Sequence, residues 1–241
     1  MTLLDLITAQ SARLKQAGVS FGHGTLNAFD EAAWLVLWSL GMELDALEEK
    51  AKQVLGDDEI AKATALIDRR IETRAPAAYL TREAWLQNVP FYIDERSIVP
   101  RSFIAELIVD GEGTGTLDAW LTDQTRRVLD LCTGNGSLAV IAALAFPEVT
   151  VDAADISDDA LAIARINVDR HRLGDRIRVL KSDLFEQLPG PYDLIVCNPP
   201  YVNSHSMQAL PPEYQHEPAL ALAGGEDGMD FIRPLLAGIA A

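Results

Sequence analysis

The stretch Leu194-Ile195-Val196-Cys197-Asn198-Pro199-Pro200-Tyr201 decides the fold of this chain. Its four apolar residues predict a buried strand of a parallel sheet, and the asparagine with two prolines places polar groups where that strand ends. Open α/β sheets bind their ligands at this carboxyl edge. Because proline lacks an N–H and has a restricted φ, the carbonyl groups here stay free to accept hydrogen bonds, and a planar NH2 group is a suitable donor. The alternative is a plain turn that binds nothing.

Three further apolar strands precede this stretch, and they are predicted at 128–132, 149–154 and 177–180. An almost wholly apolar helix at 137–145 and a second helix that begins after the cap residue Ser157 lie between them. Alternating strands and helices imply right-handed crossovers and a parallel sheet with helices on both faces. The predicted fold class is therefore α/β, with a doubly wound sheet.

Residues 1–83 differ in pattern from the rest of the chain, because they predict helices, show few strand signals and contain no polar cluster suited to catalysis. We assign them to a small helical domain that recognises the substrate. Short β-type runs in 84–98 predict a hairpin that connects this domain to a catalytic domain over 99–241. The glycine-rich stretch 110–116 follows a predicted helix and carries two acids, so we interpret it as a flexible linker rather than a nucleotide loop.

Composition narrows the possible partners. The 241 residues include 20 basic and 36 acidic ones, giving a net charge of −16. Such a surface repels phosphate backbones and attracts a basic protein; alternatively, the charge serves solubility alone. No apolar run is long enough to span a bilayer, and the first residues lack a secretion signal, so we expect a cytoplasmic protein that does not bind a membrane. Two cysteines and four scattered histidines predict neither a disulfide framework nor a metal site.

Polar residues also follow the three earlier strands. The loop 130–136, Asp-Leu-Cys-Thr-Gly-Asn-Gly, has glycines for a tight turn and an acid that disfavours pyrophosphate but suits a positive amino or sulfonium group. Asp155 comes 19 residues after the last of these glycines, near the offset of about 20 residues at which an acid binds ribose hydroxyls. Asp183 follows the third strand and is placed to reach an adenine amino group, with Leu184 beside the ring. Each acid alone is equally a solvated or capping residue, but together they predict a pocket for an adenosine with an amino-acid tail.

Together these motifs resemble the class I S-adenosylmethionine-dependent methyltransferases, in the branch that methylates planar amino groups. Segments 21–25, 76–80, 91–96 and 99–102 resemble the protein-glutamine N5-methyltransferases, and among these the enzymes that act on a large-subunit ribosomal protein. The resemblance implies a Rossmann-like sheet, S-adenosylmethionine as the methyl donor, and a basic ribosomal protein as the substrate. Arg101, in the last segment, is either a ligand contact or an ordinary surface charge.

The resemblance also implies roles for individual residues. Donor binding is assigned to Asp130, Thr133, Gly134, Gly136, Asp155, Ile156, Asp183, Leu184 and Asn198. Catalysis on the acceptor amide is assigned to Asn198, Pro199, Pro200 and Tyr201, and no metal is expected.

Two features depart from the family pattern. Cys132 replaces a glycine, and the chain reaches Ala241 after a predicted helix, before the last three of the family's seven strands. The resemblance therefore implies a sheet truncated after its fourth strand, whose uncovered edge offers a route to oligomers.

Three other functions stay open at this point. They are a glutamine methyltransferase for peptide-chain release factors, an N-methyltransferase for adenine or guanine in nucleic acid, and a non-catalytic module for ribosome assembly. The net charge and the lack of a Lys/Arg cluster with interleaved aromatics argue against the nucleic-acid enzyme. Methyl incorporation distinguishes an enzyme from a binding module.

Overall fold

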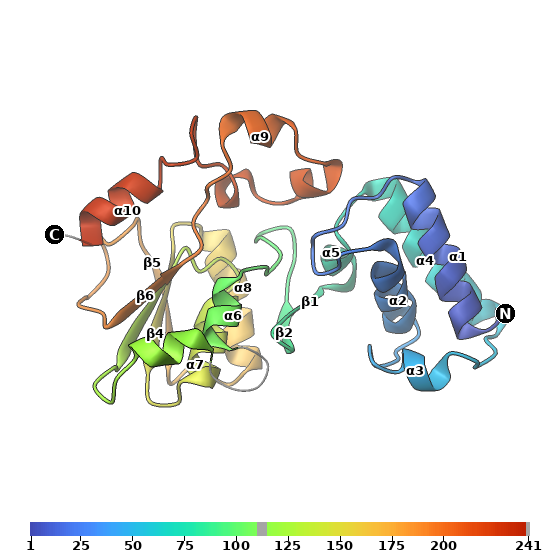
Figure 1. The fold of residues 1–241 in the computed structure, drawn as a ribbon, viewed down its shortest axis with the longest axis horizontal. Helices are drawn as coiled ribbons and strands as arrows, with labels where there is room; N and C mark the ends of the chain where they lie inside the picture. Colours follow the sequence, from blue (N-terminus) through green and yellow to red (C-terminus); the bar gives the residue numbers. More distant parts are fainter. Residues whose placement is uncertain (110–114, 240–241) are drawn as a thin grey trace. The chain divides into compact units, whose positions relative to one another are not determined.

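The computed structural model describes residues 1–109 and 115–239, and Figure 1 shows its helices and strands. Most of the linker predicted at 110–116 lies outside the described residues. The chain forms two compact units. The first consists of Met1–Glu83 and Pro211–His216, and the second of Ala84–Leu210 and the chain from Glu217 onward. No sequence pattern had indicated that the short segment Pro211–His216 belongs with the first unit.

The first unit is helical. It contains α1 (Leu3–Gln16), α2 (Ala28–Ser39), α3 (Leu47–Lys50), α4 (Asp57–Thr73), α5 (Ala77–Thr81) and the 3-10 helix η2 (Pro212–His216). Thr2 and Asp5 form a capping box that begins α1, and the Asn27 side chain accepts the N–H groups that begin α2. Leu6 and Leu35 belong to the fully buried apolar residues of this unit, whose burial stabilises the packing of α1 on α2.

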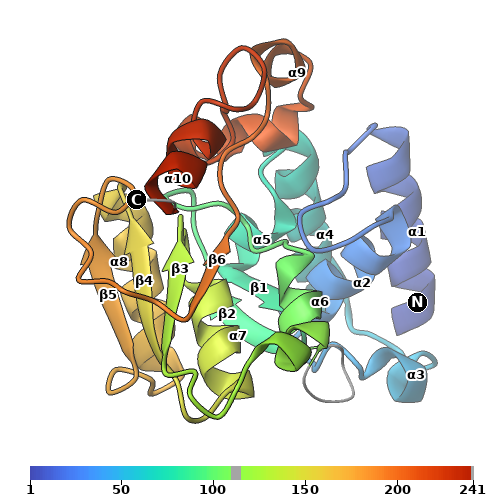
Figure 2. The same ribbon diagram turned by 60° about the vertical axis from the view of Figure 1, so that its left-hand side comes forward.

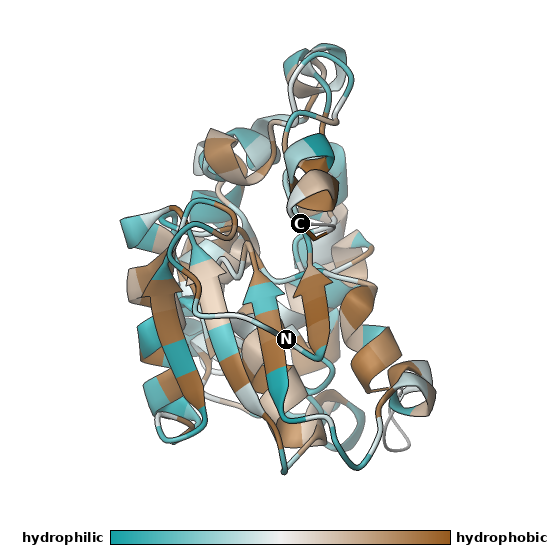
Figure 3. Cartoon of the chain, turned by 90° about the vertical axis from the view of Figure 1, so that its left-hand side faces the viewer, coloured by the Kyte–Doolittle hydropathy of each residue, from teal (hydrophilic) through white to brown (hydrophobic). Residues whose placement is uncertain are grey.

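The second unit is built on a parallel sheet. Its strands are β3 (Arg127–Leu131), β4 (Thr150–Asp155), β5 (Ile177–Lys181) and β6 (Leu194–Cys197). They lie in the order β5-β4-β3-β6, and all their arrowheads point the same way (Figures 2 and 3). The predicted α/β fold is confirmed. In this described sheet β5 and β6 are the edge strands, and association of copies through β6 stays a prediction.

Two strands form the hairpin predicted before the sheet. They are β1 (Glu83–Leu86) and β2 (Val89–Tyr92), which form a sheet of their own. Backbone with φ of +49° at Gln87 and +60° at Asn88 makes the turn between them, and asparagine is among the residues that tolerate such values best.

Helices cover both faces of the parallel sheet. Side chains of β3 alternate between the faces, so Val128 belongs to the core with α6 (Ile104–Ile108), α7 (Ser137–Ala145) and α8 (Asp158–Arg170). Leu129 and Leu131 pack in the other core, with Leu235 of α10 (Ile232–Ile239). Ser157 caps α8 as predicted, accepting the N–H of Ala160. The remaining elements are η1 (Thr116–Trp120), α9 (Ser204–Gln208) and η3 (Ala219–Ala221).

None of the helices in the described part of the chain has the length and apolar character needed to cross a bilayer. Among the same residues, His, Cys, Asp and Glu side chains form no group of three that could hold a metal ion.

Candidate active site

A single pocket collects the carboxyl ends of β3, β4 and β6. In the sheet Leu131 lies opposite Cys197, so Cys132 and Asn198, the next residues of their strands, come together at the same edge. The pocket encloses about 880 Å³ of space, open solvent included.

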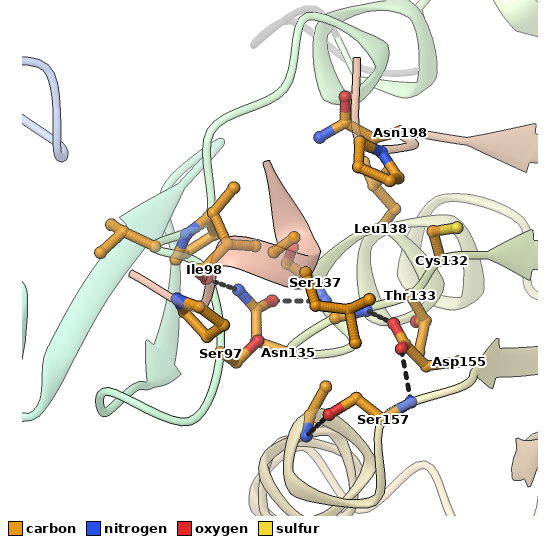
Figure 4. Close-up of a pocket in the computed structure, with 18 of the residues that line it drawn as sticks. Ser97, Ile98, Cys132, Thr133, Asn135, Ser137, Leu138, Asp155, Ser157 and Asn198 are labelled. Atoms are coloured by element: carbon orange, nitrogen blue, oxygen red, sulfur yellow. Dashed lines mark hydrogen bonds between the residues drawn. The ribbon is translucent and has the colours of Figure 1, made fainter. Parts of the chain in front are cut away.

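The lining residues come from four stretches of the second unit. They are 96–102 before α6, the β3–α7 loop with the start of α7, the end of β4 with the start of α8, and parts of 198–231 (Asn198, Pro200, Pro218, Leu220, Ala221 and Phe231). Figure 4 shows Asn198 on one side of the pocket and Asp155 with Ser157 on the other.

The loop between β3 and α7 turns sharply. Cys132, Gly134 and Gly136 all have positive φ, at +60°, +56° and +80°. A side chain at Gly136 would place its Cβ 3.2 Å from Ala164 of α8, so glycine there allows the two helices to approach each other. The loop therefore presents backbone, Thr133 and Gly134 to the pocket, where larger side chains would block a ligand.

Asp155 ends β4 at the floor of this pocket. Its Oδ2 accepts the N–H of Gly134 at 2.9 Å, and its Oδ1 accepts the N–H of Ser157 at 2.9 Å (Figure 4). Desolvation raises the pKa of this carboxyl, although the backbone N–H groups oppose the shift. Asp155 thus fixes the β3–α7 loop while facing the pocket, and its oxygens keep lone pairs that can accept from a ligand hydroxyl.

Asp130 lies beneath the loop and does not line the pocket. It is fully buried, and its Oδ2 accepts the hydroxyl of Thr133 at 2.5 Å and the N–H of Ala139 at 3.0 Å. Its Oδ1 is buried and makes no hydrogen bond with any residue that the structure describes. Burial raises the pKa of this carboxyl to about 7, and the nearby Asp155 contributes. Asp130 therefore links the loop to α7 and adds an acidic group behind the pocket.

The Asn-Pro-Pro-Tyr motif is divided between the pocket and its surroundings. Asn198 and Pro200 line the pocket, whereas Pro199 is not among the lining residues and Tyr201 is 60% exposed beside it. The chain after Tyr201 is held by backbone hydrogen bonds of Val202 to Leu222 and Gly224, both 2.8 Å. The residue that follows the motif, Val202, is therefore fixed by backbone hydrogen bonds to the segment 222–224.

Three other residues proposed from the sequence do not line the pocket, and the first of them is Gly136 of the β3–α7 loop. Asp183 is exposed, and its backbone N–H donates to Gln187. Leu184 is half-buried in the core on the α10 face. Their roles in donor binding stay predictions.

Sequence patterns did not indicate that the segment 96–102 forms a wall of this pocket. Asn135 donates its amide to the carbonyl of Ile98 at 2.8 Å, and its backbone carbonyl accepts from Asn167 of α8 at 2.9 Å. The fully buried Asn167 also exchanges two hydrogen bonds with the backbone of Tyr92 at the end of β2, of 2.7 and 3.0 Å. Two asparagines thus hold both ends of the segment between Tyr92 and Ile98. These contacts join residues more than 30 positions apart, which local patterns cannot reveal.

Arg101 of the same wall is paired with a carboxylate. Its guanidinium donates to both oxygens of Glu217, at 2.7 and 2.6 Å, and Glu217 also accepts the N–H of Val99 at 3.0 Å. Arg101 therefore lines the pocket and is held by an ion pair with Glu217. The interpretation of Arg101 as an ordinary surface charge is not supported.

The sheet, the glycine turn and the polar strand ends are arranged as expected for a methyltransferase, and comparisons with known proteins show that the chain belongs to this class. The family model of the methyltransferase small domain matches residues 108–211, which contain the β3–α7 loop, Asp155 and the Asn-Pro-Pro-Tyr motif.

Within this class the chain belongs to the ribosomal protein uL3 glutamine methyltransferases. It is 51% identical to the protein of that name from Burkholderia pseudomallei, over 98% of this chain and 78% of the relative. The corresponding protein from Bordetella pertussis is 53% identical, again over 98% and 78%. The one from Neisseria meningitidis serogroup B is 47% identical, over 98% of this chain and 77% of the relative.

Proposed function

We propose that this chain transfers a methyl group from S-adenosylmethionine to the side-chain amide nitrogen, N5, of a glutamine in ribosomal protein uL3. The observation that carries the proposal is the position of Asn198, which lines the same pocket as the β3–α7 loop and Asp155. The relatives named as uL3 glutamine methyltransferases supply the identity of the acceptor.

The pocket fits an adenosine-containing cation. We assign the ribose hydroxyls of the donor to Asp155, which faces the pocket. Because burial raises the pKa of Asp130 to about 7, this carboxyl supplies little attraction for a sulfonium below neutral pH. Ile156, Leu138 and Ala160 provide apolar surface for a base and an aliphatic chain. When bound, S-adenosylmethionine supplies an electrophilic methyl group.

An amide nitrogen is a weak nucleophile because its lone pair is delocalised into the carbonyl. We infer that Asn198 Oδ1 and the Pro199 carbonyl accept the two N–H bonds of the glutamine amide and draw its nitrogen toward tetrahedral geometry. A new N–C bond then forms as the S–C bond breaks, and the amide proton leaves to water. Orientation and preorganised acceptors account for the rate, and Tyr201 forms a side of the amide site.

We assign recognition of the protein acceptor to the first unit. Acidic side chains are concentrated in its segment 43–58 and are exposed; they are Glu43, Asp45, Glu48, Glu49, Asp57 and Asp58. A basic ribosomal protein is attracted to such a surface. We infer from this acceptor that the enzyme acts in the cytoplasm, where ribosomal proteins are made.

The test uses the full chain, purified uL3 and S-adenosylmethionine carrying a labelled methyl group. We expect label in uL3 that survives nuclease treatment, while release factors and nucleic acids stay unlabelled. Label in a nuclease-sensitive acceptor would support a nucleic-acid enzyme, and label in release factors the other glutamine enzyme. No incorporation, together with stable binding to uL3, would support a binding module.

A further inference from the structure

The ion pair between Arg101 and Glu217 connects two walls of the pocket. Arg101 lies in one wall, beside Val99 and Pro100. Glu217 directly precedes Pro218 of the other wall, which continues to Leu220 and Ala221. The two charged residues are 116 positions apart in the chain, so the pair joins segments that no local structure holds together.

Burial of this ion pair costs desolvation free energy, and removal of either partner would leave a buried charge without compensation. The Glu217 side chain is 0% exposed and that of Arg101 is 27% exposed. A buried carboxylate must be compensated by charge and hydrogen bonds. The hydrogen bonds that Glu217 accepts include two from the guanidinium in bidentate geometry and one from the N–H of Val99. Bidentate pairing fixes direction as well as distance, which a single contact does not.

The Arg101–Glu217 pair lies next to the side of the pocket that contains Asn198, where we propose that the glutamine amide binds. The donor loop is fixed separately, by Asp155 on Gly134 and by Asn135 on Ile98. The wall that Glu217 fixes, from Pro218 to Ala221, faces the same pocket as Asn198 and Pro200. The Asp155–Gly134 hydrogen bond shares no residue with the Arg101–Glu217 pair, so the donor loop keeps this hydrogen bond when the pair is broken.

We propose that Glu217, through Arg101 and Val99, is a positioning residue that sets the acceptor-side wall against Asn198. The inference rests on the proposed function. It concerns the alignment of the glutamine amide with the methyl group, and neither Glu217 nor Arg101 takes part in the bonds that form and break.

Alignment errors of about 1 Å lower enzymatic rates by about 100-fold, even when the altered residue lies away from the chemistry. We expect Glu217→Gln, which keeps the size and one acceptor but loses the charge, to lower kcat on uL3 by about 10- to 100-fold. The dissociation constant of S-adenosylmethionine should change by less than about 3-fold, since the donor loop keeps its own hydrogen bonds. Arg101→Lys should behave in the same way, because an ammonium cannot form the bidentate pair.

The matched control is Arg178→Lys. Arg178 of β5 also forms a bidentate pair, with Asp152 of β4 at 2.9 and 2.8 Å, but neither residue lines the pocket. Its kcat should equal that of the unaltered chain. Glu217→Ala, Arg101→Ala and the double variant complete a cycle, and the double variant should lose no more kcat than the worse single variant, because the pair acts as a unit.

Three results would overturn the inference. These are an unchanged kcat in folded Glu217→Gln and Glu217→Ala, an equal loss of donor affinity and kcat, or multiplying losses in the double variant. Amide hydrogen exchange of the peptide containing Val99, measured without substrates, provides a readout that needs no activity. It should be faster in Glu217→Ala, and unchanged exchange would contradict the structural basis of the proposal. Failure of the unaltered chain to methylate uL3 in this assay would instead contradict the proposed function.

Discussion

At the scale of single residues, the most informative group is a carboxyl that water does not reach. Asp130 is fully buried, and burial raises its pKa from the ordinary 3.8 to about 7. Between these two values the folded protein binds a proton that the unfolded chain has lost. The contribution of Asp130 to the free energy of unfolding is therefore complete below pH 4 and lost as the pH rises toward 7.

Replacing Asp130 by asparagine should remove this pH dependence, because the neutral amide mimics the protonated acid. From pH 5 to pH 8 the unaltered chain should lose about 3 kcal/mol more unfolding free energy than the Asp130→Asn variant. Urea denaturation at both pH values measures the difference, with Asp175→Asn at an exposed position as the control. Parallel pH profiles for the Asp130→Asn variant and the unaltered chain would contradict the account.

Sequence patterns indicated the sheet edge at which the pocket lies, but they could not show which of the residues there are buried beneath it. The sequence indicated that Asp130 and Asp155 lie near the carboxyl ends of their strands, and the structure has Asp130 inside β3 and Asp155 as the last residue of β4. The patterns could not show that Asp130 points beneath the loop, because that depends on which face of β3 the residue occupies. They also missed Glu217, whose role is visible only when Arg101 is brought to it across 116 positions.

At the scale of secondary-structure elements, the β3–α7 turn depends on the close approach of α7 and α8. Gly136 has a φ of +80°, and an added Cβ would lie 3.2 Å from Ala164 of α8. Gly136→Ala should therefore lower the free energy of unfolding by about 1–3 kcal/mol and weaken donor binding, because the donor loop must shift. Gly174→Ala, at a position with open space and ordinary φ, is the control for urea denaturation and donor titration. Equal stability of the two variants would show that the turn tolerates a side chain.

Strands were easier to predict than the contacts between elements. Runs such as 194–197 are apolar because the parallel sheet is covered on both faces, and burial of this kind is visible in any short window. The attachment of the hairpin is different, since Asn167 of α8 pairs with the backbone of Tyr92 from 75 positions away. A single buried asparagine in a helix gives no local signal of its partner.

At the scale of the whole molecule, the chain returns to its first unit after the Asn-Pro-Pro-Tyr motif. Glu213 of the segment Pro211–His216 has a side chain that is 0% exposed and accepts the N–H of Ser20 at 3.1 Å. The fully buried Arg70 pairs with Glu31 at 2.8 Å and lies 3.4 Å from Glu213, and Arg74 lies 2.9 Å from the same carboxylate. Charged groups buried in this way require one another, so the segment is fixed by the pairing of its carboxylate with these arginines.

Replacing Arg70, the central cation of this network, should therefore strongly lower the free energy of unfolding. Arg70→Met leaves the buried Glu31 without its cation, and we expect a loss of about 3–5 kcal/mol in the free energy of unfolding of the first unit. Arg69→Met changes the exposed neighbour in the same helix and should stay within about 0.5 kcal/mol of the unaltered chain. Thermal and urea denaturation of both variants measures the contrast. A stable Arg70→Met variant would mean that apolar packing, rather than this ion network, holds Pro211–His216.

The central claim is that Asn198 presents a glutamine amide of uL3 to the methyl donor, and mass spectrometry of the reacted protein tests it most directly. After incubation with the full chain and S-adenosylmethionine, uL3 should gain one methyl group, and fragmentation should place it on the side-chain nitrogen of a glutamine. The Asn198→Ala variant should bind the donor nearly normally and leave uL3 unmodified. A methyl group on any other kind of residue, or full modification by Asn198→Ala, would contradict the account.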